Sequence, residues 1–162
     1  MSSDVGSHQN HNPSENQCVF CTVASGRDTT SLLHVDESIV AFNDRKPAAD
    51  QHILVVPKKH LASINDLKSH DLETVKKMKE VGLQLISGRL CKSVDELLKS
   101  NITKERAYLM GFVSPPFNSI NHIHMHVLST PITTWWPKSL GFGKFIFRNV
   151  DDIIAKIESQ QK

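Results

Sequence analysis

The run from residue 122 to residue 128 constrains the fold more than any other part of the chain. It reads His-Ile-His-Met-His-Val-Leu, so histidines alternate with large apolar residues. Successive side chains of a strand point to opposite faces. The alternation therefore predicts a strand over residues 120–128, with His122, His124 and His126 on one face. The other face carries apolar side chains that can enter a core, namely Ile123, Met125 and Val127.

Three imidazoles in a row on such a strand indicate catalysis. A neutral imidazole is nucleophilic near pH 7, and a neighbouring imidazolium can stabilise charge or deliver a proton. Phosphoryl transfer depends mostly on positioning and charge stabilisation, so histidines can attack phosphorus without a metal ion. The alternatives are a solvent-facing row of histidines and a metal site that takes individual members as ligands.

The remaining pattern predicts an α+β protein. Strands are expected over residues 31–36, 38–42, 52–56 and 107–113, and a variable connection over residues 97–106. Helical spacing predicts a short helix after Cys18, a long helix over residues 69–90 and a final helix over residues 150–157. An antiparallel meander with one long helix and a C-terminal helix differs from a doubly wound sheet.

Length and composition limit the classes of protein that remain. A chain of 162 residues suits one domain, which we place at residues 16–162 with a C-terminal extension, after a polar tail at residues 1–15 that we expect to be disordered. The net charge of +2, without basic stretches that also carry aromatics, gives no reason to expect a nucleic-acid partner. No apolar run reaches about eighteen residues, so no membrane partner is expected. Without an apolar signal peptide, and with three cysteines, the expected location is the cytoplasm, and a chain of this size can also diffuse into the nucleus.

The histidine run resembles the signature of the histidine triad superfamily, in which histidines alternate with apolar residues. Two upstream segments, Ala41-Phe-Asn-Asp44 and His52-Ile-Leu-Val-Val-Pro-Lys-Lys-His60, look like that family's other blocks at the expected separation. The resemblance covers about residues 18–136. Pro115-Pro-Phe-Asn-Ser-Ile120 and the extended C-terminus are similar to the Hint branch.

The resemblance implies a HIT-like, dimeric fold and a hydrolase of nucleoside phosphoramidates, of the adenosine 5′-monophosphoramidase type. It makes His124 the nucleophile that forms a nucleotidyl-histidine intermediate. It implies that His126 contacts the phosphate and assists proton transfer, that His52 is the additional histidine beside the triad, and that His122 completes the catalytic set. Nucleotidyl transferases of the superfamily have glutamine at the third triad position, so His126 favours water as the acceptor.

The resemblance also implies a site for purine nucleoside monophosphates of the AMP type. Asp44 corresponds to an acidic residue that binds both ribose hydroxyls, which one carboxylate can do. Beside His124 and His126, the implied phosphate side includes Asn118 and Ser119. The implied wall around the base consists of Val19, Phe20, Val23 and Phe42, with Arg45 at a position that is usually apolar.

Two further departures from the family pattern lie on the leaving-group side. Phe117 stands where relatives often have glycine, and Gly111 where they often have asparagine. The leaving group and the base preference therefore stay open.

Four residues form a candidate zinc site. Cys18-Val-Phe-Cys21 has the spacing of metal ligands, and His60 and His122 occupy positions that join it in some relatives. Two thiolates with two imidazoles would make a closed structural site. Two reduced core cysteines and a redox pair are the alternatives. No cofactor is expected to be required for the chemical step.

Other functions and an oligomeric state are also open to test. A nucleotide-binding scaffold or sensor could retain the triad as a weak or vestigial site and use Trp135, Trp136 and the segment after Pro137 as a contact surface. Hydrolysis of dinucleoside polyphosphates or adenylyl sulfate is another alternative, as is removal of AMP from nucleic-acid ends, which too few cysteines disfavour. The resemblance implies a homodimer that uses the helix over residues 69–90 and a neighbouring strand.

Overall fold

A six-stranded antiparallel sheet organises the chain, in the strand order β1-β2-β3-β5-β4-β6. The computed structural model describes residues 18–28, 30–102, 106–133, 142–143 and 145–160. The strands are β1 (Leu32–Val35), β2 (Ile39–Asn43), β3 (His52–Pro57), β4 (Tyr108–Val113), β5 (Met125–Ser129) and β6 (Phe147–Asn149). The helices are α1 (Val19–Ala24), α2 (Leu72–Leu90), α3 (Val94–Ile102) and α4 (Val150–Ser159), and a 3₁₀ turn, η2 (Ser69–Asp71), precedes α2. The predicted α+β class is confirmed, whereas the predicted tail at residues 1–15 lies outside the described residues.

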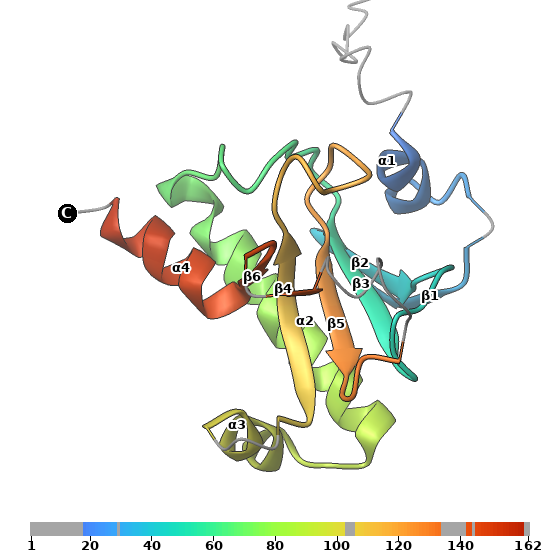
Figure 1. The fold of residues 1–162 in the computed structure, drawn as a ribbon. Helices are drawn as coiled ribbons and strands as arrows, with labels where there is room; N and C mark the ends of the chain where they lie inside the picture. The colour runs from blue at the N-terminus through green and yellow to red at the C-terminus, as the bar shows by residue number, and fades with distance from the viewer. Residues whose placement is uncertain (1–17, 29, 103–105, 134–141, 144, 161–162) are drawn as a thin grey trace, which may run out of the picture.

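Helices pack on both faces of the sheet, and the alternation of side chains along each strand decides which face each residue joins. Figure 1 shows α2 running across the back of the sheet, while α1 lies near β3. Alternate residues of β2 and β3 join the core under α2, namely Ile39, Ala41, Ile53 and Val55. The residues between them pack with Phe20 and Val23 of α1, namely Val40, Phe42, Leu54 and Val56. The short α1 therefore faces the opposite side of the sheet from the main core.

Strand β5 begins later than the sequence indicates. It starts at Met125, so residues 120–124 of the predicted strand are a loop, and the expectation of a strand from residue 120 is wrong. The reason lies in the backbone hydrogen bonds, because the N–H of Ile123 donates to the carbonyl of Leu61 (2.7 Å) outside the sheet. Ile123, Met125 and Val127 still enter the core, as predicted.

The connection predicted over residues 97–106 is wrong at its start, because α3 covers Val94–Ile102. A capping box marks the start of α3. The hydroxyl of Ser93 accepts from the N–H of Glu96 (3.3 Å), while the Glu96 carboxylate accepts from the N–H of Ser93 (2.7 Å). Leu97 is fully buried beneath this helix.

The glycine at position 111 has a structural explanation. Gly111 in β4 pairs with His126 on one side and with Asn149 of β6 on the other. A Cβ atom at this position would lie 2.1 Å from the carbonyl oxygen of Arg148. The close approach of β6 therefore excludes an asparagine here unless the backbone moves.

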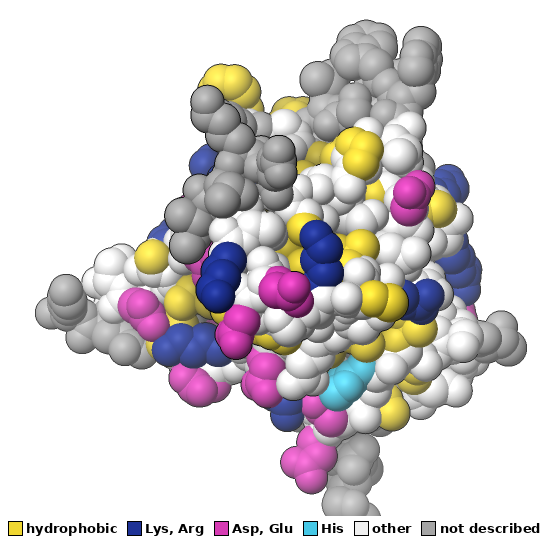
Figure 2. Space-filling model, turned by 90° about the horizontal axis from the view of Figure 1, so that it is seen from below, with side chains coloured by type: hydrophobic (Ala, Val, Ile, Leu, Met, Phe, Trp, Pro, Cys, Tyr) yellow, Lys and Arg dark blue, Asp and Glu magenta, His cyan; other side chains and the backbone are white. Residues whose placement is uncertain are grey.

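Two observations concern the helices and the surface of the described residues. None of the described helices combines the length and the apolar character needed to cross a membrane. On the face in Figure 2, the described basic and acidic side chains are interspersed. That face therefore presents no continuous basic surface.

Candidate active site and metal centre

The three triad histidines lie on the α1 side of the sheet and are buried. Their exposed fractions are 0% for His122, 8% for His124 and 7% for His126. Phe20 of α1 packs edge-on against the rings of His122 and His124, with centroids 6.0 and 5.0 Å away. The rings of His124 and His126 lie 5.0 Å apart. The loop before β5 and the first residues of that strand thus bring the predicted residues together.

The backbone fixes the tautomer of His124. Its Nδ1 lies 2.8 Å from the carbonyl oxygen of His122. A carbonyl can only accept, so Nδ1 carries the hydrogen and Nε2 of the neutral ring keeps its lone pair. Burial lowers the pKa of His124, partly opposed by its hydrogen bond to the carbonyl and by the charge of Asp44. His124 is therefore neutral near pH 7, with Nε2 available as a nucleophile.

The tautomer of His126 follows from a chain of two hydrogen bonds. The backbone N–H of Ala48 donates to Nδ1 of His52 (3.1 Å), so the hydrogen of a neutral His52 ring is on Nε2. That Nε2 lies 2.8 Å from Nδ1 of His126, which therefore accepts. The hydrogen of His126 is consequently on Nε2, a buried atom without a hydrogen-bond partner among the described residues. Burial, followed by the charges of His124 and His52, holds the pKa of His126 well below its usual value.

A cavity of about 260 Å³ adjoins these rings. We call it the cleft. Its lining includes His124, His126 and Ser119. It also contains most of the residues implied for nucleotide binding, namely Val19, Phe20, Val23, Phe42, Asp44 and Arg45. Apolar walls with a few converging polar groups are typical of a small-molecule site.

Asp44 lies where its carboxylate faces both the cleft and the histidines. Oδ1 accepts from the N–H of Lys46 (2.7 Å), and Oδ2 lies 3.5 Å from Nε2 of His52. The side chain is 19% exposed, so a ligand in the cleft can still reach it. We call Asp44, His52 and His126 the histidine chain.

The other implied residues are placed less uniformly. The side chain of Arg45 is 70% exposed, and its guanidinium contacts Asp28 (3.1 Å) and the hydroxyl of Thr30 (3.0 Å). The amide of Asn118 donates to the carbonyl of Ile120 (3.1 Å), and its side chain lines a smaller cavity behind His122 and His124. Phe117 is 62% exposed.

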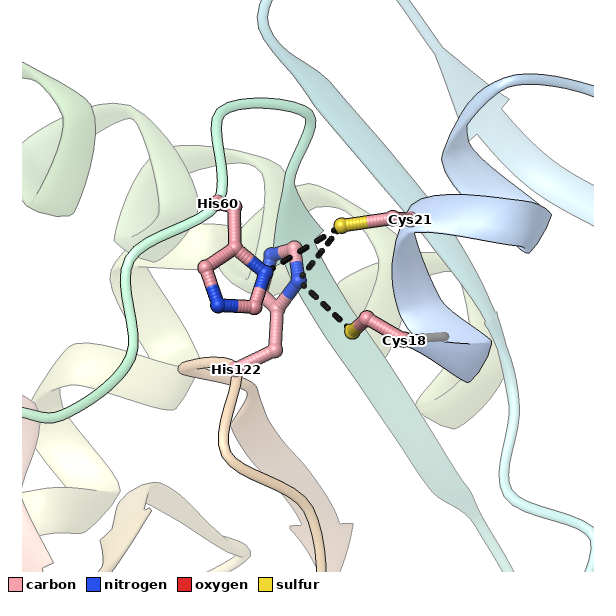
Figure 3. A group of neighbouring side chains, drawn as sticks. All are labelled: Cys18, Cys21, His60 and His122. Carbon is pink, nitrogen blue, oxygen red and sulfur yellow. Dashed lines mark hydrogen bonds between the residues drawn. The ribbon is translucent and has the colours of Figure 1, made fainter. Parts of the chain in front are cut away.

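The four predicted metal ligands come together at one point. Figure 3 shows Cys18, at the start of α1, and Cys21, within α1, facing His60 and His122 across a gap. The Nδ1 of His122 lies 3.4 Å from Sγ of Cys18 and 3.5 Å from Sγ of Cys21. The Nδ1 of His60 lies 3.2 Å from Sγ of Cys21. We call these four residues the thiol–imidazole cluster.

The cluster fits a tetrahedral metal ion. A Zn²⁺ ion with Zn–S of about 2.3 Å and Zn–N of about 2.05 Å has S···N edges of roughly 3.6 Å, close to the distances in the cluster. The Nε2 of His122 lies 2.9 Å from the carbonyl oxygen of Pro57. This bond leaves the lone pair on Nδ1, as a metal ligand requires. Burial lowers the pKa of His122 to about 4, so the ring is neutral near pH 7.

The histidine chain is a second group with metal-ligand spacing, but its hydrogen bonds oppose a metal ion. The N–H of Ala48 occupies the Nδ1 lone pair of His52, so Nε2 must keep its hydrogen. A metal ion at Nε2 would require loss of that hydrogen from a neutral ring. The residues of the histidine chain therefore do not fit a metal, whereas those of the thiol–imidazole cluster do.

Several residues of the site were not expected from the sequence. Phe142 packs edge-on against His52 and His126, with ring centroids 5.8 and 5.5 Å away. Thr30, Leu54 and Ile120 add to the wall of the cleft. Phe142 approaches from a distant part of the chain, so no local pattern could have indicated it. Leu54 follows the alternation of β3 and could have been found two residues after His52.

Comparisons with known proteins agree with this geometry. The family model described as "Scavenger mRNA decapping enzyme C-term binding" matches residues 17–139. A HIT family hydrolase from Legionella pneumophila has the same fold, with 28% identity and a TM-score of 0.56 over 74% of this chain and 98% of that chain.

Two curated relatives are similar over most of the sequence. The adenosine 5′-monophosphoramidase HINT3 of Xenopus tropicalis is 39% identical over 98% of this chain and 99% of its own length. The bifunctional adenosine 5′-phosphosulfate phosphorylase/adenylylsulfatase HINT4 of Arabidopsis thaliana is 39% identical over 86% of this chain and 90% of its own length. With the triad, the cleft and these relatives in agreement, the chain belongs to the histidine triad superfamily, on its Hint branch.

Proposed function

We propose that the protein hydrolyses nucleoside 5′-phosphoramidates of the AMP type through a nucleotidyl intermediate on His124. The observation that carries the proposal is the tautomer of His124, which lines the cleft. Its Nδ1–H donates to the carbonyl of His122, so its Nε2 is unprotonated. The names of the relatives support a hydrolase of nucleoside monophosphate derivatives.

In the first half of the reaction, Nε2 of His124 attacks phosphorus and the bond from phosphorus to the leaving amine breaks. The ring gains positive charge in this step, because Nδ1 keeps its hydrogen. The carbonyl of His122 and the carboxylate of Asp44 both favour that charge. The Nε2–H of His126 can donate to a phosphoryl oxygen, where negative charge concentrates in the transition state.

In the second half, water attacks phosphorus and the bond to Nε2 of His124 breaks. The leaving amine gains one proton in the first half and the water loses one in the second, so the enzyme returns to its starting state. These protons are exchanged with water in the cleft, because a neutral His126 has only the hydrogen on Nε2 and its Nδ1 already accepts from His52. The Nε2–H of His126, which has no protein partner among the described residues, stays directed at the phosphoryl oxygen. A buried site also limits access of bulk water.

Binding precedes this chemistry. We propose that Asp44 accepts from both ribose hydroxyls and that Phe20, Phe42 and Val23 contact the base. All four side chains line the cleft, and the three apolar ones are buried. Exclusion of water from an apolar wall favours binding of a planar purine.

The experiment that tests the proposal is turnover of a fluorogenic adenosine 5′-phosphoramidate by the wild type and by His124→Ala. We expect the variant to lose at least about a thousandfold in kcat, while AMP still binds in calorimetry. Undiminished turnover by the variant would overturn the proposal. Wild-type protein that binds AMP without turnover would favour the nucleotide-binding scaffold instead.

A second activity, hydrolysis of adenylyl sulfate, is favoured by the name of the Arabidopsis relative. Sulfate needs no proton to leave, whereas the amine of a phosphoramidate does. Comparing kcat/KM for the two substrates in one competition assay decides between them.

We propose that the thiol–imidazole cluster holds a structural zinc ion. Two thiolates and two neutral imidazoles would fill its coordination, so the ion would supply structure and no open catalytic position. It would tie α1, which carries the base wall, to the loops that contain His60 and His122. None of the three cysteines forms a disulfide in the structure, which suits the proposed cytoplasmic and nuclear location.

A homodimer remains part of the proposal. Light scattering coupled to size exclusion tests it, because a dimer doubles the mass of 18.2 kDa. Trp135 and Trp136, named above as a contact surface for the scaffold alternative, lie outside the described residues.

A further inference from the structure

The carboxylate of Asp44 makes a contact with a buried histidine that ribose binding does not require. Oδ1 is held by the N–H of Lys46, and Oδ2 lies 3.5 Å from Nε2 of the buried His52. A residue that only bound ribose would need no second contact of this kind. The contact places a negative charge beside His52, which is hydrogen-bonded to His126 at the cleft.

The charge acts on the choice between two tautomers of His52. With the hydrogen on Nε2, the ring donates toward His126 and presents hydrogen to the Asp44 carboxylate. With the hydrogen on Nδ1, that hydrogen would oppose the N–H of Ala48, and the Nε2 lone pair would face the carboxylate. Asp44 and Ala48 therefore favour the same tautomer from opposite ends of the ring.

The tautomer of His52 in turn determines that of His126. A hydrogen on Nε2 of His52 requires Nδ1 of His126 to accept, and so directs the hydrogen of His126 to Nε2. The reverse arrangement would leave a lone pair of His126 at the cleft, facing the oxygens of a phosphate. An anion would then meet a repelling atom instead of a donor.

We propose that Asp44 is also a positioning residue, which acts through His52 to keep the Nε2–H of His126 directed at the phosphoryl group. The inference rests on the proposed function for its substrate and adds a second role for a residue assigned to ribose. Its consequence is that ribose binding and transition-state stabilisation share one carboxylate.

A cycle that combines one substitution with one change of substrate separates the two roles. The proteins are the wild type and Asp44→Asn, and the substrates are adenosine 5′-phosphoramidate and its 2′,3′-dideoxy analogue. The amide oxygen of asparagine can still accept from the N–H of Lys46, so the turn is retained. The dideoxy substrate has no hydroxyls for Asp44 to bind, and any remaining effect of the substitution must arise elsewhere.

With the dideoxy substrate we expect Asp44→Asn to lower kcat about tenfold with little change in KM. This is less than the roughly hundredfold loss caused by removing a transition-state donor itself, because the donor is still present. Equal kcat for the two proteins on this substrate would overturn the inference. Asp95→Asn, an exposed carboxylate in the first turn of α3, is the matched control for loss of one charge.

Imidazole ¹⁵N NMR reports the tautomers without turnover. In the wild type we expect hydrogen on Nε2 of both His52 and His126, and in Asp44→Asn a mixture of tautomers. A wild-type His126 with its hydrogen on Nδ1, or unchanged tautomers in the variant, would overturn the inference. If no phosphoramidate is hydrolysed, the proposed function fails, whereas the NMR result still decides the tautomers.

Discussion

The thiol–imidazole cluster and the histidine chain are built from similar side chains but are suited to different tasks. Each contains two histidines whose rings lie about 5 Å apart, at 4.8 Å for His60 and His122 and 5.1 Å for His52 and His126. In the cluster, a backbone carbonyl accepts from His122 and leaves a lone pair for a metal. In the chain, a backbone N–H donates to His52 and leaves a hydrogen on the other nitrogen.

The comparison teaches that the backbone group beside a histidine decides what the ring can do. A carbonyl converts the far nitrogen into a ligand or a nucleophile, as it also does for His124. An amide converts it into a donor. The imidazole alone does not distinguish the two sites, because both contain a pair of buried or partly buried histidines.

The supports of the two sites also differ. His52 and His126 lie on paired strands, with Leu54 opposite His126 in the register. Cys18, His60 and His122 lie in loops or at the start of a helix. We therefore expect the histidine chain to affect turnover, and the thiol–imidazole cluster to affect stability and the shape of the base wall.

The largest expected effect comes from His126→Gln. Glutamine cannot hold an N–H donor at the position of the His126 Nε2–H, so hydrolysis of the nucleotidyl-histidine slows by about a hundredfold, the loss that follows removal of a transition-state donor. Mass spectrometry of the intact protein should detect the adduct on His124. The exposed His70→Gln is the control. Unchanged hydrolysis in His126→Gln would contradict the expectation that the histidine chain affects turnover.

Metal removal should cause the next largest effect. An ion that binds only the folded state, present at about a hundred times its Kd, contributes about 2.7 kcal/mol to stability. Chelation, or Cys21→Ser, should therefore lower Tm by roughly 5 to 10 °C in differential scanning calorimetry. Cys91→Ser, at an exposed cysteine away from the cluster, is the matched control. A Tm that changes with neither chelator nor added zinc would contradict a structural role for zinc.

The acid limb of stability sharpens the contrast further. The pKa of His126 is lower in the folded than in the unfolded protein, so the unfolded state binds the extra proton. Stability from this group is complete above a pH of about 6.5 and decreases as pH falls, by up to about 1.4 kcal/mol per pH unit.

Urea unfolding at several pH values between about 7.5 and 5 measures this slope. The difference between the wild type and His126→Gln removes contributions that both proteins share, including those of the metal ligands. We expect the wild type to have the steeper dependence. Parallel curves would mean that burial of His126 does not exclude its proton.

The sequence was sufficient for the parts of this comparison that depend on period and motif. Alternation placed Ile123, Met125 and Val127 in the core. The spacing of Cys18 and Cys21 indicated a metal site, to which the family resemblance added His60 and His122. These inferences rest on side chains, whose types the sequence states directly.

The direction of each hydrogen bond could not be predicted in the same way. Every residue except proline offers the same N–H and carbonyl groups, so nothing marks Ala48 as the donor to His52 or Pro57 as the acceptor from His122. These contacts depend on how loops settle against the sheet. The same cause explains the late start of β5, where Ile123 bonds to Leu61 outside the ladder.

The smallest expected effect concerns Arg45, whose partners are side chains at the surface. Its guanidinium contacts Asp28 and Thr30, and the side chain is 70% exposed. Exposed ion pairs contribute little to stability. We expect Arg45→Ala to leave the urea midpoint unchanged and to raise KM for the phosphoramidate by less than about threefold.

The ratio of kcat/KM for adenosine and guanosine substrates completes this test. A guanidinium that reads a base edge discriminates by about 1–3 kcal/mol, so a change of tenfold in the ratio would show that Arg45 contacts the base. We expect the ratio to stay constant, because Asp28 and Thr30 already engage the guanidinium. The buried histidines are held by backbone partners away from water, whereas the partners of Arg45 are side chains at the surface.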